Sequence, residues 1–106
     1  MENKAHQLRI YQIKKGKMAE WLEFFRDTLL PLHDRVNLPV IAAWRNVDQE
    51  NEFIWIRSFK SVDTIEEQEK AFFSQPDRIA LGDVRGTWLD GFKVRVIESH
   101  DLPLSS

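Results

Sequence analysis

The sequence predicts one α+β domain of the ferredoxin-like class, with elements in the order β-α-β-β-α-β and a four-stranded antiparallel sheet. Three observations support this class. Residues 53–59 alternate between two faces with a period of two, as a strand does, and three other stretches alternate in the same way. Two intervening stretches repeat apolar residues at the spacing of an amphipathic helix. The length of 106 residues corresponds to a single domain, residues 1–106, with room for a core.

The first half of the chain contains two predicted strands with a helix between them. Residues 7–13 alternate and are predicted to form a strand that ends at a turn over residues 14–16. Residues 17–35 are predicted to form a helix, in which Pro31 should kink the last turn or begin a second short turn. Residues 40–47 form the second predicted strand, and a short polar loop joins it to the third, so the two must pair antiparallel.

The second half of the chain repeats the pattern less clearly. Ser61 is the predicted N-cap of a helix that runs to about residue 74. Residues 77–90 carry apolar residues at helical spacing but contain two glycines, which predicts a short, irregular helix that ends near Trp88. Residues 91–99 alternate and form the predicted fourth strand, which a polar tail follows.

Composition narrows the classes of function. The chain has no cysteine, which excludes disulfides, thiolate catalysis and cysteine-ligated metals. The net charge of -2 comes from mixed signs with no long basic run, so no nucleic-acid partner is expected. No apolar stretch is long enough to span a membrane and no secretory signal is recognisable, so we expect a cytoplasmic protein. The three histidines are too scattered for a metal site, and we expect no metal.

The two faces of the predicted sheet differ in kind. We expect the helices to cover the aliphatic face, which comprises Leu8, Ile10, Ile54, Ile56, Val94 and Val96. The open face would then carry Arg9, Tyr11, Ile13, Phe53, Trp55, Arg57 and Phe59. An exposed aromatic patch of this extent is larger than soluble monomers usually have. We therefore expect a homodimer in which two sheets pack face to face about a two-fold axis.

Several short motifs, in this order, resemble the NIPSNAP family. They are Leu-Arg-Ile-Tyr-Gln-Ile-Lys-Lys-Gly at residues 8–16, Leu30-Pro31-Leu32, and Asn51 before Phe53-Ile54-Trp55-Ile56, followed by Phe59, Ser61 and an acidic helix. The resemblance covers roughly residues 7–98. NIPSNAP-like domains belong to the dimeric α+β barrel superfamily, so the resemblance implies that two sheets close into a barrel. It implies no defined activity, although the wider superfamily includes cofactor-free monooxygenases, muconolactone isomerases, haem-degrading enzymes and haem peroxidases.

The candidate substrate-binding residues lie mainly on the two central strands. They are Arg9, Tyr11, Trp55 and Arg57, with Trp44 and His33 at the rim. Arginine provides a fixed set of donors for a carboxylate, enolate or phosphate. Tyrosine can donate a proton, and tryptophan can stack on a planar ligand. Haem-degrading relatives use an Asn, Trp and His grouping, and because no histidine occurs in residues 53–74, we expect no haem and no other cofactor.

Each candidate also has a structural interpretation. Arg9 and Arg57 would form interface ion pairs, with the aromatic residues in the dimer core. His33 would be a solvated histidine near a helix C-terminus. Glu66, Glu67 and Glu69 would form a solvated helix face, and Trp21 and Trp88 would be core residues. The side of the sheet that carries Trp44 stays open, because its alternation fits either face.

Three functions stay open at this point. The first is a NIPSNAP-like homodimer of undefined role with a small-molecule pocket between the sheet and either the helices or the second chain. The second is a cofactor-independent monooxygenase or isomerase that acts on a small planar carbonyl or anionic compound. The third is a non-catalytic scaffold dimer. The sequence leaves it open whether the protein is an enzyme.

Overall fold

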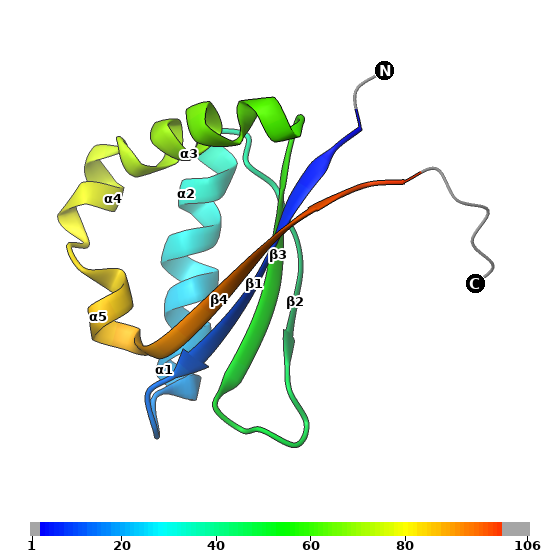
Figure 1. The fold of residues 1–106 in the computed structure, drawn as a ribbon. Helices are drawn as coiled ribbons and strands as arrows, with labels where there is room; N and C mark the ends of the chain where they lie inside the picture. The colour runs from blue at the N-terminus through cyan, green and yellow to red at the C-terminus, as the bar shows by residue number, and fades with distance from the viewer. Residues whose placement is uncertain (1–2, 101–106) are drawn as a thin grey trace.

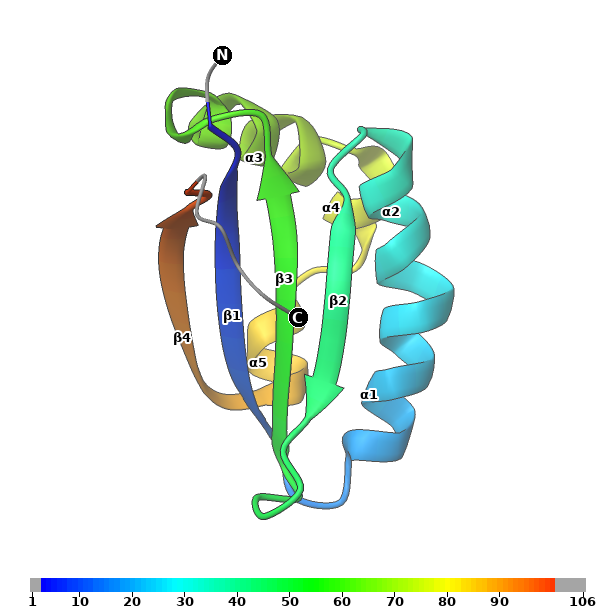
Figure 2. The same cartoon turned by 90° about the vertical axis from the view of Figure 1, so that its right-hand side faces the viewer.

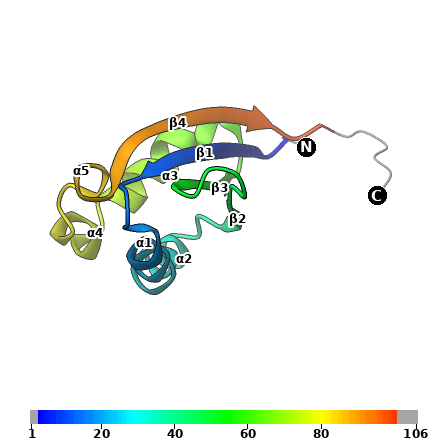
Figure 3. The same ribbon diagram turned by 90° about the horizontal axis from the view of Figure 1, so that it is seen from below.

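The computed structural model describes residues 3–100, which fold into a four-stranded sheet with the helices on one side of it (Figure 1, Figure 3). The strands are β1 (Ala5–Ile13), β2 (Val40–Arg45), β3 (Glu52–Phe59) and β4 (Leu89–Glu98). Their order is β2-β3-β1-β4, and neighbouring strands are antiparallel. β1 and β3 are the central pair, with Arg9 directly opposite Trp55. The predicted ferredoxin-like α+β fold is confirmed.

A single helical segment connects β1 to β2. It consists of α1 (Met18–Phe24), a π-helical turn η1 (Phe25–Leu29) and α2 (Leu30–Arg35). Pro31 has no amide hydrogen, so it cannot make the usual α-helical bond to the turn before it. In the π-helical turn, the Leu30 amide donates to the carbonyl of Phe25, five residues earlier. The helix predicted over residues 17–35 is confirmed, and its irregularity is this wider turn.

Four short helical pieces connect β3 to β4. They are a 3-10 turn η2 (Val62–Thr64), α3 (Ile65–Phe73), α4 (Pro76–Ala80) and α5 (Val84–Trp88). Ser61 is the N-cap residue, as predicted, and its amide donates to the Thr64 hydroxyl over 3.2 Å. The irregular helix predicted within residues 77–90 is two helices, α4 and α5. Gly82 lies between them with a φ of +67°, a conformation that glycine adopts readily and other residues rarely do.

The helices cover the opposite face of the sheet from the one predicted. The face beneath them carries Arg9, Tyr11, Ile13, Phe53, Trp55, Arg57 and Phe59, and all seven are buried. Leu8, Ile10, Ile54 and Ile56 lie on the face that no helix covers (Figure 2). The prediction that Val94 and Val96 share the face of these four residues is wrong. Val94 pairs with Arg9 and Val96 with Gln7, so both valines lie on the helix side of the sheet.

The reason for the reversal lies in the first helical segment, whose inner surface is itself aromatic. The ring centroids of Trp21 and Phe25 lie 5.6 Å and 5.0 Å from that of Phe53, and Phe25 lies 5.2 Å from Trp55. Edge-to-face aromatic packing of this kind stabilises the contact beyond simple area burial. The large rings therefore pack on the large rings, and the aliphatic face remains open.

Within residues 3–100, the helices are too short or too polar to cross a bilayer.

Candidate functional site

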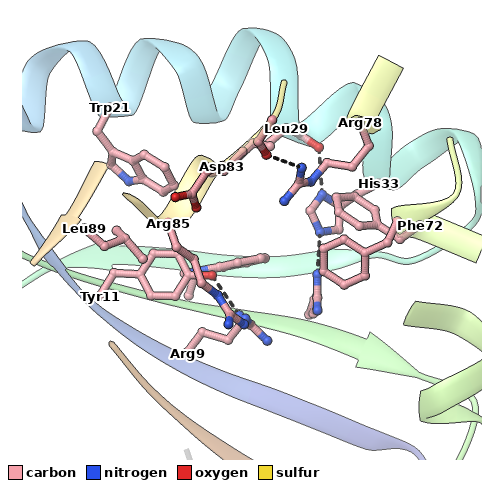
Figure 4. A pocket seen from close by; sticks show the side chains of 15 residues that line it. Arg9, Tyr11, Trp21, Leu29, His33, Phe72, Arg78, Asp83, Arg85 and Leu89 are labelled. Carbon is pink, nitrogen blue, oxygen red and sulfur yellow. Dashed lines mark hydrogen bonds between the residues drawn. The ribbon is translucent and has the colours of Figure 1, made fainter. Parts of the chain in front are cut away.

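A cavity of about 400 Å³ lies between the covered face of the sheet and the helices (Figure 4). Arg9 and Tyr11 of β1 and Trp55 and Arg57 of β3 line its sheet side. The first helical segment and α3 contribute walls, and the α4 and α5 region contributes its outer edge. The volume is within the range of small-molecule binding pockets.

Gln7 connects two buried arginines on the sheet side of the cavity. Its side-chain oxygen accepts a hydrogen bond from Arg9 Nη1 at 2.8 Å and another from Arg57 Nε at 2.9 Å. Arg9 Nε also donates to the Tyr11 hydroxyl oxygen at 2.9 Å. Both guanidinium groups lie about equally far from the Trp55 ring, with centroid distances of 5.5 Å and 5.6 Å. The alternation of β1 and the register with β3 place these side chains together.

Arg57 forms a largely buried ion pair with Glu69 of α3. Arg57 Nη2 donates to the Glu69 carboxylate at 3.0 Å, and the Glu69 side chain is 30% exposed. Burial, together with the charge of Arg9, lowers the pKa of Arg57 to about 10, against the opposing influence of Tyr11 and Glu69. The prediction that Glu69 belongs to a solvated face is wrong, because this residue turns inward. Glu66 and Glu67 are exposed, as predicted.

His33 is buried against the cavity and is not a solvated residue at a helix end. Its Nδ1 bonds to the Leu29 carbonyl at 2.7 Å, and its Nε2 accepts from Arg57 Nη1 at 3.3 Å. This pattern requires a neutral ring with its proton on Nδ1. Burial lowers the pKa of His33 to about 4, the nearby Arg57 and Arg9 add to the decrease, and the Leu29 bond opposes it. The ring is therefore neutral at pH 7.

The aromatic walls of the cavity contain hydrogen-bond donors without acceptors. The indole N–H groups of Trp21 and Trp55 are buried and have no partner within residues 3–100. The Tyr11 hydroxyl accepts from Arg9, so its own proton remains available to a ligand. The two indole N–H groups are closed off from the cavity, so of these donors only the Tyr11 hydroxyl favours a ligand that carries an acceptor atom.

Charged residues of α4, α5 and the segment between them form the outer edge of the cavity. Arg78 and Arg85 both lie at this edge (Figure 4). Arg78 donates to the Gly82 carbonyl at 3.3 Å, and Arg85 lies over the Phe92 ring at 4.2 Å. The Asp83 carboxylate accepts from the Gly86 amide at 2.9 Å. Sequence reasoning missed Arg78, Asp83 and Arg85, because they belong to the segment with the weakest periodicity.

Five of the six predicted binding residues line the same cavity. They are Arg9, Tyr11, His33, Trp55 and Arg57. Trp44 lies on the other face of the sheet, since it pairs with Ile54 and is 50% exposed. The predicted core residues Trp21 and Trp88 pack on each other with a centroid distance of 5.9 Å, and Trp21 also lines the cavity. Among the residues that the structure describes, no group of three or more metal-ligating side chains comes together.

Solved structures with the same fold come from several bacteria. A NIPSNAP family protein from Agrobacterium tumefaciens superposes with a TM-score of 0.84, at 18% identity, over 95% of this chain and 90% of that one. A NIPSNAP domain protein from Burkholderia xenovorans gives a TM-score of 0.83 at 15% identity, over 95% and 99% of the two chains. A third structure, a Nitrosomonas europaea protein provisionally named an antibiotic biosynthesis monooxygenase, gives a TM-score of 0.67 at 12% identity, over 93% of this chain and 92% of that one.

No curated protein matches this chain. The NIPSNAP family profile, in contrast, matches residues 6–81, which is well over half of the chain. The matched part contains both central strands, the first helical segment and most of the residues that line the cavity. The protein therefore belongs to the NIPSNAP family, as its motifs suggested.

Proposed function

We propose that the protein is a homodimer that binds a small, planar molecule with an anionic or carbonyl group in the cavity between its sheet and helices. The observation that supports this most is the cavity itself. It combines two buried guanidinium groups, aromatic walls and the free proton of the Tyr11 hydroxyl in about 400 Å³. Pockets of this kind, apolar with a few converging polar groups, are typical ligand sites. A purely scaffolding role would make no use of such a space, so it has less support.

A second candidate is cofactor-independent chemistry in the same cavity, either oxygenation or isomerisation. It is favoured by the free proton of Tyr11, which could protonate an oxyanion, and by the neutral ring of His33. Arg9 or Arg57 would hold the developing negative charge, and Trp55 would stack on the substrate. The likeness in fold to the Nitrosomonas europaea protein is consistent with this candidate.

The homodimer would form through the face of the sheet that carries no helix. This face presents Leu8, Ile10, Ile54 and Ile56 next to the half-exposed ring of Trp44. Continuous apolar surface on a sheet usually marks an interface, and a two-fold axis lets the same face cover itself. The dimer face is thus the reverse of the one expected from the sequence, and the cavity lies within one chain.

A thermal-shift screen of small carboxylates, enols and phenols tests the ligand site. Val84 lies at the outer part of the cavity, so Val84→Trp should abolish the shift of any compound that binds there. Arg57→Ala should reduce it. Hits whose stabilisation survives both changes would contradict the proposed site.

Light scattering at micromolar concentration tests the dimer. The expected mass is twice 12.6 kDa, and Ile54→Glu on the open face should give the mass of one chain. Ile79 of α4 is 64% exposed on the helix side of the sheet, so Ile79→Glu is the control and should remain dimeric. A wild-type monomer would refute the face-to-face arrangement.

A further inference from the structure

The two buried arginines of the cavity are not equivalent. Arg9 is only 4% exposed, and none of the four ion pairs formed within residues 3–100 involves it. Its hydrogen-bond partners are neutral, namely the Gln7 amide oxygen and the Tyr11 hydroxyl. Its second terminal nitrogen, Nη2, makes no hydrogen bond within the described part of the chain. A buried charge without a counter-charge is strongly unfavourable, so Arg9 needs a counter-charge that residues 3–100 do not supply.

Arg57, in contrast, already has a counter-charge. Its three nitrogens bond to Gln7, His33 and Glu69, and the Glu69 carboxylate neutralises its charge. A ligand anion at Arg57 would have to compete with the Glu69 carboxylate, which already binds there. The two guanidinium groups that bond to the Gln7 oxygen and the Glu69 carboxylate together carry a net charge of one positive unit, and the uncompensated charge is that of Arg9.

We infer that the cavity takes a planar monocarboxylate or equivalent monoanion whose charged group pairs with Arg9, while Arg57 and Gln7 hold the Arg9 guanidinium in place. This inference rests on the proposed function of the cavity and specifies its ligand. Arg9 lines the cavity, so Nη2 and Nη1 together can receive the two oxygens of a carboxylate. The proton of the Tyr11 hydroxyl is a further donor, and no cation would satisfy it.

The rest of the cavity fits the body of such a ligand. Trp21, Trp55 and Phe72 give it flat, apolar walls. At the outer edge, Arg78 and Arg85 outnumber the single carboxylate of Asp83, so this region also attracts anions. A neutral ligand of the same shape would leave Arg9 buried and unpaired.

The test uses pairs of probes that differ only in charge, namely 2-naphthoate with 2-naphthamide and benzoate with benzamide. Calorimetric titration of the full chain at pH 7 should show each acid binding about ten- to hundredfold more tightly than its amide, since a charged hydrogen bond is lost. Arg9→Met should remove this preference. Arg26→Met removes an exposed charge far from the cavity and should keep it. Arg9→Gln, which removes the charge but keeps hydrogen-bonding groups at this position, should likewise lose the preference for acids.

Different outcomes overturn different statements. If Val84→Trp removes binding of acids and amides alike but Arg9→Met leaves the preference for acids intact, the cavity is a ligand site and the role of Arg9 is wrong. If both probe classes still bind to Val84→Trp, they do not use the cavity and the proposed function fails with them. If no acid binds, or if acids and amides bind equally, the monoanion is refuted, while the broader screen still tests the cavity. Should Arg9→Met not fold, Arg9→Gln takes its place, and a preference for acids that survives this change refutes the role of Arg9.

Discussion

The buried, neutral His33 should make the stability of the protein fall steeply in mild acid. The unfolded chain binds a proton on this ring near the ordinary pKa of 6.5, whereas the folded chain binds it only near 4. Between these values the unfolded state holds more protons, so a decrease in pH favours unfolding. Stability from this residue is fully present above the unfolded pKa and is lost as the pH falls toward the folded one.

The magnitude follows from the two pKa values. Between pH 7 and pH 5 the free energy of unfolding should decrease by about 2 kcal/mol through His33 alone, and by about 3 kcal/mol once the pH reaches the folded pKa. The perturbation is His33→Gln, whose amide can still donate to the Leu29 carbonyl and accept from Arg57 but does not titrate.

Urea unfolding of both proteins at pH 7 and pH 5 measures the effect. All other ionisable groups are the same in both proteins, so the difference between the two pH dependences isolates His33. The wild type should lose about 2 kcal/mol more than the variant over this range. If the two proteins lose stability in parallel, His33 is not held neutral by burial.

Three further predictions concern stability and local opening. Arg57→Met should lower the free energy of unfolding by about 2 kcal/mol, a value reduced because Glu69 is 30% exposed. The double variant Arg57→Met with Glu69→Met should recover part of this loss. If urea unfolding shows the same loss for the single and the double variant, the two residues are not a coupled pair. Gly82→Ala should lower the free energy of unfolding by about 1 kcal/mol because residue 82 has a positive φ. Gly91→Ala should not lower it, because an added Cβ there meets only ordinary contacts. If thermal melts show Gly91→Ala to be the less stable variant, the backbone strain at residue 82 is refuted. Amides of residues 76–88 should exchange with solvent faster than those of β1 and β3, as measured by hydrogen exchange.

The fold could be predicted from the sequence because its signals are local. The alternation of β1 and β3 and the helical spacing before residue 35 are strong and uninterrupted, so the element order follows. The identity of the covered face could not be predicted in the same way, because both faces are apolar. Only the match between the rings of the first helical segment and those of the strands decides it, and that match depends on three-dimensional packing.

The candidate site was predicted only in part, for a related reason. Arg9, Tyr11, Trp55 and Arg57 share one face of adjacent strands, so period-two alternation is enough to group them. His33 and Glu69 reach the same place from different helices. Glu69 left a signal, since it is a charged residue on the apolar stripe of α3, where a buried arginine can be its partner. Arg78 and Arg85 left none, because their helices are too short for a periodic pattern.

The wall of the cavity formed by α4 and α5 differs from the other walls in how it is held. Each of these helices has five residues, too few to be stable without packing against the rest of the domain. Val84 and Trp88 are the side chains through which α5 contacts the core. We therefore expect residues 76–88 to open locally at a lower free energy than the sheet and the first helical segment. If the proposed ligand site is correct, this wall is the one through which we expect a ligand to enter, while the sheet that forms the floor of the cavity stays folded.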